Sequence, residues 1–314
     1  MSTAPHRIDK LVVIGVGLIG GSFALAQKAA GCTGTVVGVG RGRMNLEEAL
    51  NLGIIDRFVP LDGDWAAEVT GADFVLVAAP VAQYPALLRA MAPHLGPHTI
   101  VTDAGSTKQD AIAAARETLG AALPRFVPGH PIAGTEQSGA AAAFSTLYAD
   151  RSVVLTPLPE TDPLAIATVA AAWQTCGARV RTLDALAHDR IFAAVSHLPH
   201  LLAFALVDEL AARPDAEDLF RFAASGFRDF TRIAASSPEM WRDIALANRA
   251  SLLAEIAAFR AQLDRVAAMV ETGDGAALEA VFAHARAARR GWASQRNAAG
   301  NPVPADGPRE PQQD

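Results

Sequence analysis

The chain has few cysteines and no long run of basic residues. Its two cysteines, Cys32 and Cys176, are too few and too far apart in 314 residues for a disulfide framework or a zinc site. We therefore expect a reducing, cytoplasmic environment and no bound metal. The net charge of −6 and the lack of a basic run argue against nucleic-acid binding as the main task.

The chain also lacks a convincing membrane segment. Arg7 and Lys10 precede an apolar run at 11–27, an order of residues that is typical of a signal peptide. However, glycines within the run would weaken a membrane helix, and the run divides naturally into a strand, a tight turn and a helix. We judge no other stretch long and apolar enough to span a bilayer, so we expect neither export nor a membrane partner.

The first part of the chain alternates between two kinds of segment. Up to about residue 180, short β-branched runs are separated by alanine-rich stretches with helical patterns. Strands that alternate with helices imply a mostly parallel sheet with helices on both faces, so we predict a Rossmann-type, doubly wound α/β fold. The expected strands are 11–14, 35–39, 74–78, 99–102, 126–127 and 152–155. The expected helices are 21–30, 46–52, 82–91 and 108–119.

The second part of the chain contains only helical patterns. We expect helices at 185–210, with a bend at Pro199, and at 217–224, 238–271 and 275–295. The chain is long enough for about two domains. We place a dinucleotide-binding domain at 1–181, an all-helical domain at 182–296 and a disordered, proline-rich tail at 297–314.

The third of these expected helices carries an apolar seam. Six apolar residues follow one another at alternating steps of four and three: Leu252, Ile256, Phe259, Leu263, Val266 and Val270. Such spacing requires a partner helix, either in the core of the same chain or in a second subunit. We favour a second subunit because the helical domain is small and strongly apolar. The expectation is therefore an all-α dimerisation domain and a homodimer.

A glycine-rich segment at 15–20 follows the first expected strand and begins the first helix. In it, Gly15 permits a tight turn, Gly17 lets the backbone approach a pyrophosphate, and Gly20 lets helix and strand pack closely. The helix N-terminus, at Leu18 and Ile19, offers backbone N–H groups to the phosphates. We predict a dinucleotide site here.

Two further segments belong to the predicted cofactor site. Ala79 and Pro80 directly follow the expected strand at 74–78. At the end of the second strand, where an NAD enzyme usually has an acid for the ribose 2′-hydroxyl, this chain has Arg41 and Arg43. An arginine can pair with the 2′-phosphate of NADP. We predict that NADP and NAD are both used and that NADP is preferred; alternatively, the arginines only solvate the loop.

Four polar segments fall where this fold builds an active site, at 103–108, 129–136, 196–200 and 226–232. His130 has the side chain whose unperturbed pKa lies nearest neutrality, in a Gly/Pro-rich loop. Ser106 could act in the site or cap the helix that follows it. His197 and His200 are three residues apart, so they share a helix face, but no third ligand of zinc type completes a metal site.

These segments, in this order, resemble the prephenate/arogenate dehydrogenase family, the NAD(P)-linked enzymes of tyrosine biosynthesis. The resemblance runs from about residue 10 to 292 and includes the stretches GHPIAGTEQSG, SHLPH and GFRDFTRIA. It implies an oxidative decarboxylation of prephenate, arogenate or both, with hydride transfer to NAD(P). It also implies a homodimer through the helical domain. We expect no chorismate mutase domain ahead of the first strand and no regulatory ACT domain after the last helix.

The resemblance assigns roles to individual residues. It makes His130 the acceptor of the ring hydroxyl proton, with Ser106 orienting the hydroxyl and the imidazole. It makes Arg232 the partner of a substrate carboxylate, with Trp241 lining the pocket. The other residues that it implies at the substrate are Thr135, Glu136, Asp229, His197 and His200. Glu136, Asp229 and Arg232 would form a charged network at the pocket entrance.

Several alternatives stay open at this point. An arogenate-specific NADP dehydrogenase would fit the same motifs, although His200 favours prephenate over the ammonium-bearing arogenate. A 3-hydroxyacid dehydrogenase shares the domain order but usually uses a lysine in its helical half, and residues 181–295 contain none. A non-catalytic dinucleotide sensor would need no histidine aligned with an anion-binding arginine.

Overall fold

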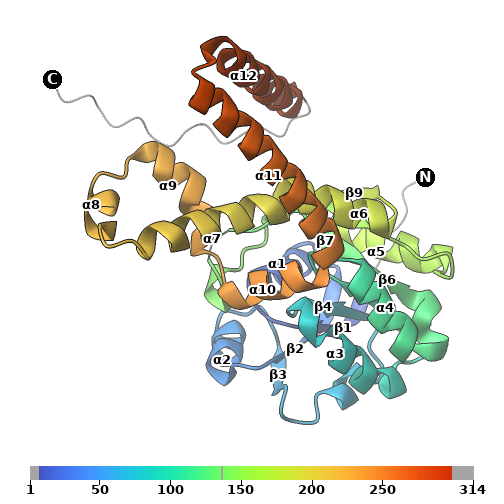
Figure 1. Ribbon diagram of the computed structural model, residues 1–314. Coiled ribbons are helices and arrows are strands. Elements are labelled where there is room, and N and C mark those ends of the chain that lie inside the picture. The colour runs from blue at the N-terminus through green and yellow to red at the C-terminus, as the bar shows by residue number, and fades with distance from the viewer. Residues whose placement is uncertain (1–6, 136, 299–314) are drawn as a thin grey trace. The chain divides into compact units, whose positions relative to one another are not determined.

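The N-terminal half of the chain forms a six-stranded parallel sheet (Figure 1). The structure, a computed structural model, describes residues 7–135 and 137–298. The sheet order is β3-β2-β1-β4-β5-β6, which is the order of doubly wound dinucleotide-binding folds. The predicted fold class is therefore confirmed. The strands are β1 (Ile8–Ile14), β2 (Thr33–Gly40), β3 (Arg57–Pro60), β4 (Phe74–Val77), β5 (Ile100–Asp103) and β6 (Phe126–Val127).

Helices bury both faces of this sheet. Successive side chains of a strand point to opposite faces, so Leu11 and Val13 join one apolar core while Val12 and Ile14 join the other. The first core is completed by α1 (Leu18–Ala29), α2 (Arg43–Asn51) and α5 (Pro163–Thr175), and the second by α3 (Tyr84–Met91) and α4 (Gln109–Thr118). Short 3-10 turns lie at Ala66–Val69, Val81–Gln83, Ala92–His94, Gly120–Arg125 and Ala140–Ala142.

His130 lies in a second, smaller sheet rather than in a loop. Strand β7 (Gly129–Pro131) pairs antiparallel with β8 (Ser152–Leu155), which pairs parallel with β9 (Arg179–Thr182). His130 stands opposite Val154. The expectation of a Gly/Pro-rich loop was wrong because β8 supplies backbone partners that the local sequence does not reveal. The same reason explains why β3 and β9 were missed.

The predicted helix at 185–210 is interrupted before Pro199. It consists of α6 (Ala185–Phe192), a π-helical turn (Ala193–His197) and α7 (Leu198–Ala211). Proline has no N–H to donate and its ring crowds the preceding turn, so a wider turn accommodates it. The elements that follow are α8 (Ala216–Arg221), α9 (Ser225–Thr231), a 3-10 turn (Arg232–Ala235) and α10 (Pro238–Ala247).

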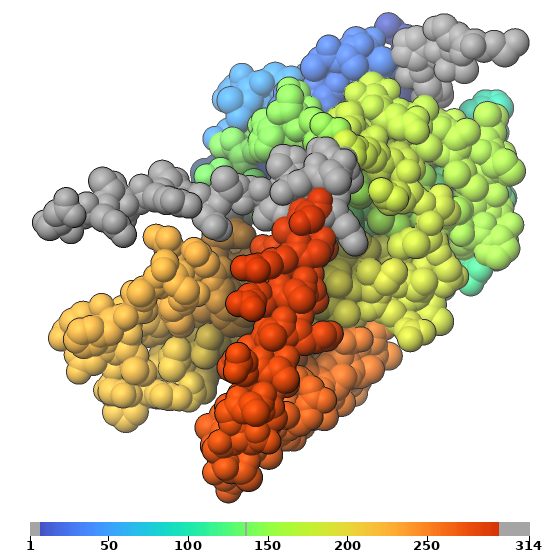
Figure 2. Space-filling model, turned by 90° about the horizontal axis from the view of Figure 1, so that it is seen from above, coloured from blue at the N-terminus to red at the C-terminus, as the bar shows by residue number. Residues whose placement is uncertain are grey.

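The predicted helix at 238–271 is two helices, because the chain breaks at Asn248 between α10 and α11 (Arg249–Thr272). The chain divides into two compact units, one that ends at Glu255 and one that begins at Ile256. The second unit contains most of α11 and, after a turn at Gly273 (φ +69°), α12 (Gly275–Ala298). Figure 2 shows α12 in red, and most of its described side chains are exposed.

The apolar seam of α11 is only partly covered within one chain. Leu252 is 4% exposed, whereas Leu263 is 51% and Val270 is 64% exposed. Phe282 of α12 is also exposed. Leu263, Val270 and Phe282 are therefore apolar side chains that remain exposed to solvent. The tail, predicted to be disordered, lies outside the described residues from 299 onward.

One finding corrects the view that no stretch could span a membrane. The helical stretch Ala185–Ala211 contains an 18-residue window with a mean hydropathy of 1.6, so its length and composition alone would allow it to cross a bilayer. It is weak support for a membrane protein, because the core helix of a soluble protein passes the same test.

Candidate active site

The predicted dinucleotide turn is built so that only glycine fits at two positions. Gly15 has φ +100°, and a Cβ there would lie 2.4 Å from the carbonyl oxygen of Ala78. A Cβ on Gly20 would lie 2.2 Å from the carbonyl oxygen of Gly15. The turn therefore packs directly against the end of β4, where Ala79 and Pro80 follow. The structure thus brings these two predicted cofactor residues beside the glycine turn.

Gly17 is different, because its missing side chain leaves open space. A Cβ on Gly17 would have no described atom within 4 Å. Helix α1 begins at the next residue, Leu18, and within the described chain no side chain caps it. A helix N-terminus with uncapped N–H groups and room in front of it is what a pyrophosphate requires. The turn fits a dinucleotide; that the N–H groups of Leu18 and Ile19 bind the phosphates stays a prediction.

The two arginines after β2 are both exposed and both ion-paired. Arg41 donates two hydrogen bonds to Glu239 of α10, Nη1 to Oε1 at 2.8 Å and Nη2 to Oε2 at 3.1 Å. Arg43 pairs with Glu47 one helical turn further on, at 3.0 Å. Neither arginine is simply solvated. Arg41 has a specific partner 198 residues away, which the sequence did not suggest.

A buried ion pair lies behind His130. Lys108 is fully buried, and its Nζ donates to Asp103 and to the carbonyl oxygen of Gly129 at 2.6 Å. Asp103 in turn accepts from the backbone N–H of Gly105 at 2.8 Å and of Gly129 at 3.0 Å, and from the hydroxyl of Tyr84 at 3.1 Å. The pair fixes the backbone just before His130. Lys108 is therefore a buried, paired residue rather than a solvated lysine at the start of a helix.

His130 belongs to a chain of three hydrogen-bonded side chains. Its Nδ1 lies 2.8 Å from Nε2 of His188, and Nδ1 of His188 lies 2.8 Å from Oδ1 of Asp189. His188 and Asp189 are buried, at 0% and 1% exposed. Phe192 covers the two rings, with its centroid 4.8 Å from that of His130 and 4.5 Å from that of His188. His188 and Asp189 were not identified as site residues from the sequence. They are neighbours in the helical stretch that also carries the predicted residues His197 and His200, and this was the signal that could have identified them.

The directions of these hydrogen bonds follow from the charge states. Hydrogen bonds from His188 and from two backbone N–H groups outweigh burial and lower the pKa of Asp189, so its carboxylate only accepts. His188 therefore donates from Nδ1. Burial, followed by the influence of Lys108, also lowers the pKa of His188, so the ring is neutral and its Nε2 accepts. His130 then donates from Nδ1.

The same reasoning gives the state of the remaining nitrogen of His130. Burial, then the neighbouring His188 and Lys108, hold the pKa of His130 well below its usual value of 6.5. The neutral ring carries its hydrogen on Nδ1, so Nε2 carries the lone pair. The arrangement presents a neutral imidazole with a fixed tautomer, which is suited to accept a proton.

Asp189 also shows why Ser106 does not cap the following helix. The N–H groups of Lys108 and Gln109, at the start of α4, donate to Oδ1 and Oδ2 of Asp189 at 2.9 Å each. Within the described chain, the residue at the N-cap position of α4 is Lys108, and its side chain makes no capping hydrogen bond. The capping alternative for Ser106 is wrong. Ser106 is half-buried in the segment between β5 and α4.

A second group of predicted residues surrounds Trp241. The ring of His200 stacks on Trp241 with centroids 3.7 Å apart, and the ring of His197 lies edge-on to it at 6.2 Å. Burial, with the charge of Arg232 acting in the same direction, holds the pKa of His200 below its usual value. Asn248 donates to Nδ1 of His197 at 3.1 Å and to the carbonyl oxygen of Asp189 at 2.6 Å. Asn248 thus connects the two groups of residues.

The remaining predicted substrate residues lie at the surface or are not described. Thr135 is exposed, and its hydroxyl accepts the N–H of Gln137 at 3.2 Å. Asp229 is exposed and contacts its neighbour Arg228 at 3.4 Å. Glu136 lies outside the described residues, so the predicted network of Glu136, Asp229 and Arg232 stays a prediction. No group of three His, Cys, Asp or Glu side chains suited to a metal occurs in 7–135 or 137–298.

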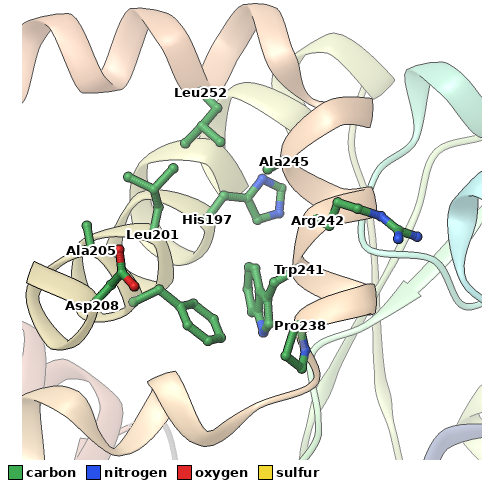
Figure 3. A pocket seen from close by; sticks show the side chains of 10 residues that line it. His197, Leu201, Ala205, Asp208, Pro238, Trp241, Arg242, Ala245 and Leu252 are labelled. Carbon is green, nitrogen blue, oxygen red and sulfur yellow. The ribbon is translucent and has the colours of Figure 1, made fainter. Parts of the chain in front are cut away.

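A cavity of about 480 Å³ lies among α7, α10 and the start of α11 (Figure 3). Its lining is mainly apolar, but it includes two buried N–H groups of the predicted site, Nε2 of His197 and Nε1 of Trp241, which have no hydrogen-bond partner among the described residues. Burial lowers the pKa of His197 to about 4, so this ring is neutral. His130, Ser106 and Arg232 do not line the cavity. The cavity therefore lies beside Trp241 and His197 and is not lined by the predicted catalytic residues.

Together these features define a class of protein. A glycine turn suited to a pyrophosphate, at the carboxyl edge of a 3-2-1-4-5-6 parallel sheet, indicates dinucleotide binding. A neutral histidine held by a second histidine and a carboxylate indicates proton transfer. The protein is a dinucleotide-dependent dehydrogenase with a helical second part.

Comparison with known proteins gives the family. Residues 23–182 match the model of the prephenate dehydrogenase nucleotide-binding domain, and residues 184–284 match that of the prephenate dehydrogenase dimerization domain. Cyclohexadienyl dehydrogenase of Zymomonas mobilis is 36% identical over 89% of this chain and 94% of its own. Prephenate dehydrogenase of Bacillus subtilis is 35% identical over 90% of this chain and 76% of its own. The chain belongs to the prephenate dehydrogenase family.

A solved structure of the family has the same fold. Prephenate dehydrogenase from Aquifex aeolicus, solved with hydroxyphenyl propionate and NAD+, superposes with a TM-score of 0.84 at 34% identity. The match covers 92% of this chain and 99% of that one. The resemblance inferred from the motifs is thus confirmed at the level of family and fold.

Substitutions at Gly15 and Gly17 should have different consequences. Gly15→Ala should lower the melting temperature, because the new methyl group meets the Ala78 carbonyl at a positive φ. Gly17→Ala should leave the melting temperature near that of the wild type, because its Cβ has room, yet weaken NAD binding by filling the space in front of α1. Thermal unfolding and calorimetric titration with NAD would measure both effects. Equal destabilisation by the two substitutions, or tight NAD binding by Gly17→Ala, would contradict this interpretation.

Proposed function

We propose that this protein catalyses the oxidative decarboxylation of prephenate to 4-hydroxyphenylpyruvate, with NAD or NADP as the hydride acceptor, in tyrosine biosynthesis. The observation that carries the proposal is the hydrogen-bonded chain from His130 through His188 to Asp189, in a member of the prephenate dehydrogenase family. Family membership gives the reaction class. The chain of side chains provides the base that this reaction requires.

In the proposed reaction His130 acts as the base for the proton of the ring hydroxyl. Its Nε2 lone pair accepts that proton while the carbon bearing the hydroxyl loses a hydride. The ring carboxylate then leaves as CO2, its electron pair enters the ring as the ring aromatises, and the phenolate oxygen so formed takes the proton back from His130. The nicotinamide ring supplies the hydride acceptor when the cofactor is bound. The hydrogen bond from Nδ1 of His130 to His188 fixes the orientation of the imidazole ring, and with it the direction of the Nε2 lone pair. A positioned base of this kind contributes roughly 10²–10⁴ in rate.

The residues around Trp241 would hold the rest of the substrate. We propose that Arg232 pairs with a substrate carboxylate, for which its planar guanidinium is suited. The ring of His200 is oriented by Trp241 on one side and by the carbonyl oxygen of Ser196, which accepts its Nδ1 hydrogen at 2.9 Å. We propose that His200 contacts the side chain of the substrate and that His197 supports it. Ser106 would orient the hydroxyl, and Thr135, Glu136 and Asp229 would lie at the pocket entrance.

For the cofactor we propose that both forms bind, with the glycine turn and Ala79–Pro80 shared between them. The lack of a carboxylate at the end of β2 and the presence of Arg41 and Arg43 favour NADP. Each charge-assisted hydrogen bond to the 2′-phosphate would contribute about 1.5–3 kcal/mol. We propose a preference for NADP on this basis.

We also propose a cytoplasmic homodimer with the domain division 1–181 and 182–296. The match to the family's dimerization domain and the exposed apolar residues of α11 and α12, Leu263, Val270 and Phe282, support association through the helical part. Burial of these side chains in a subunit interface would remove apolar surface from water.

The proposal is tested by initial rates for prephenate and arogenate, each with NAD and with NADP. We expect CO2 release and reduced cofactor with prephenate. His130→Asn should lower kcat by about 10²–10⁴ while leaving the Kd for NAD unchanged, because the base is lost and the glycine turn is intact. No turnover with either substrate would reject the proposal, and full turnover of the variant would reject the role of His130. Turnover of arogenate alone would support the arogenate-specific alternative.

The pH dependence should report the lowered pKa of His130. Only the neutral imidazole accepts the hydroxyl proton, so kcat/KM falls when His130 becomes protonated. Because burial lowers its pKa well below 6.5, kcat/KM for prephenate should stay level through pH 6.5 and decline only at lower pH. NAD is the suitable cofactor, since it has no 2′-phosphate that titrates nearby. A decline centred at or above pH 6.5 would contradict the neutral state of His130.

A further inference from the structure

The end of β2 is the position where dinucleotide-binding folds distinguish NAD from NADP. A carboxylate there accepts the ribose 2′-hydroxyl of NAD, and an arginine nearby accommodates the 2′-phosphate of NADP. In this chain β2 ends at Gly40 without a carboxylate, and Arg41 follows directly. The local sequence therefore has the arginine that accommodates NADP and lacks the carboxylate that is typical of NAD enzymes.

The fold supplies a carboxylate from a distant part of the chain. Glu239, in the first turn of α10, accepts both terminal N–H groups of Arg41 at 2.8 and 3.1 Å. The neighbouring charges have partners of their own, because Arg242 pairs with Asp243 at 2.6 Å and Arg43 pairs with Glu47. Glu239 is thus a carboxylate placed against the arginine of the ribose site.

This pair is accessible and should exchange readily. The side chain of Arg41 is 56% exposed and that of Glu239 is 43% exposed. Exposed ion pairs contribute little to stability and are screened by salt. A 2′-phosphate carries more negative charge than a carboxylate and makes strong hydrogen bonds to arginine. The 2′-phosphate can therefore replace Glu239 as the partner of Arg41, but the nearby carboxylate of Glu239 repels it. A 2′-hydroxyl meets no such repulsion and can donate to the carboxylate.

We propose that Glu239 is a cofactor-selectivity residue that competes with the 2′-phosphate for Arg41. Glu239 provides a carboxylate at the ribose site, where the end of β2 has none. NAD therefore still binds, and the preference for NADP is smaller than Arg41 alone would give. This inference rests on the proposed use of nicotinamide dinucleotides. It adds to that proposal a residue of α10 that sets the balance between the two cofactors.

The test compares two ligands that differ only in the 2′-phosphate, 5′-AMP and adenosine 2′,5′-bisphosphate, by calorimetric titration of the full-length protein. Glu239→Gln should raise the affinity ratio in favour of the bisphosphate by about tenfold, the effect of one charge-assisted hydrogen bond. Arg41→Gln should lower the ratio by about tenfold. The gain in Glu239→Gln should shrink as salt is added, because the interaction lies in solvent.

A matched control uses another exposed arginine–glutamate pair. Glu209 accepts two hydrogen bonds from Arg213 at 2.9 and 3.0 Å and is exposed to a similar degree. Glu209→Gln should leave the ratio unchanged. If Glu239→Gln leaves the ratio unchanged while both ligands bind, the selectivity role is overturned and the proposed function stands. If neither ligand binds the wild-type protein, dinucleotide use itself is overturned. A Glu239→Ala variant should repeat the shift of Glu239→Gln.

Discussion

The buried carboxylate of Asp189 is the interaction on which the candidate site depends. It accepts the N–H groups of Lys108 and Gln109 at the start of α4 and the Nδ1 hydrogen of His188, while the carbonyl oxygen of the same residue accepts from Asn248. One residue of α6 therefore joins the sheet-covering helix α4 to the helices around Trp241. It also decides which nitrogen of His188 carries the hydrogen, and through His188 it fixes the tautomer of His130.

A second buried charge supports the same histidine from behind. Asp103 and Lys108 are both removed from water, which is costly unless each charge is paired and hydrogen-bonded. Here the pair is complete, because Asp103 also accepts from Gly105, Gly129 and Tyr84. The structure uses this pair to hold the backbone that carries His130 and to keep a positive charge near it. Burial chiefly, and then the neighbouring His188 and the charge of Lys108, lower the pKa of His130, so the base stays neutral.

The features predictable from sequence were those encoded over short distances. The glycine turn at 15–20 and the alternation of strands and helices depend on neighbouring residues, so their fold class could be inferred. His130 and Trp241 were predicted as site residues from the resemblance to a family. Partners far apart in the chain were not: Asp189 lies 81 residues from Lys108, and Glu239 lies 198 from Arg41. The burial of Lys108 could not be predicted, because charged side chains are rarely buried without a partner and Asp103 becomes its partner only in the fold.

The tautomer of His130 is the central claim and can be measured directly. Nitrogen-15 NMR of the protein labelled at histidine, with His130→Asn and His188→Asn used for assignment, distinguishes protonated from unprotonated ring nitrogens. At neutral pH the structure predicts a neutral His130 with its hydrogen on Nδ1 and an unprotonated Nε2. A His130 protonated on Nε2, or on both nitrogens, would contradict the account.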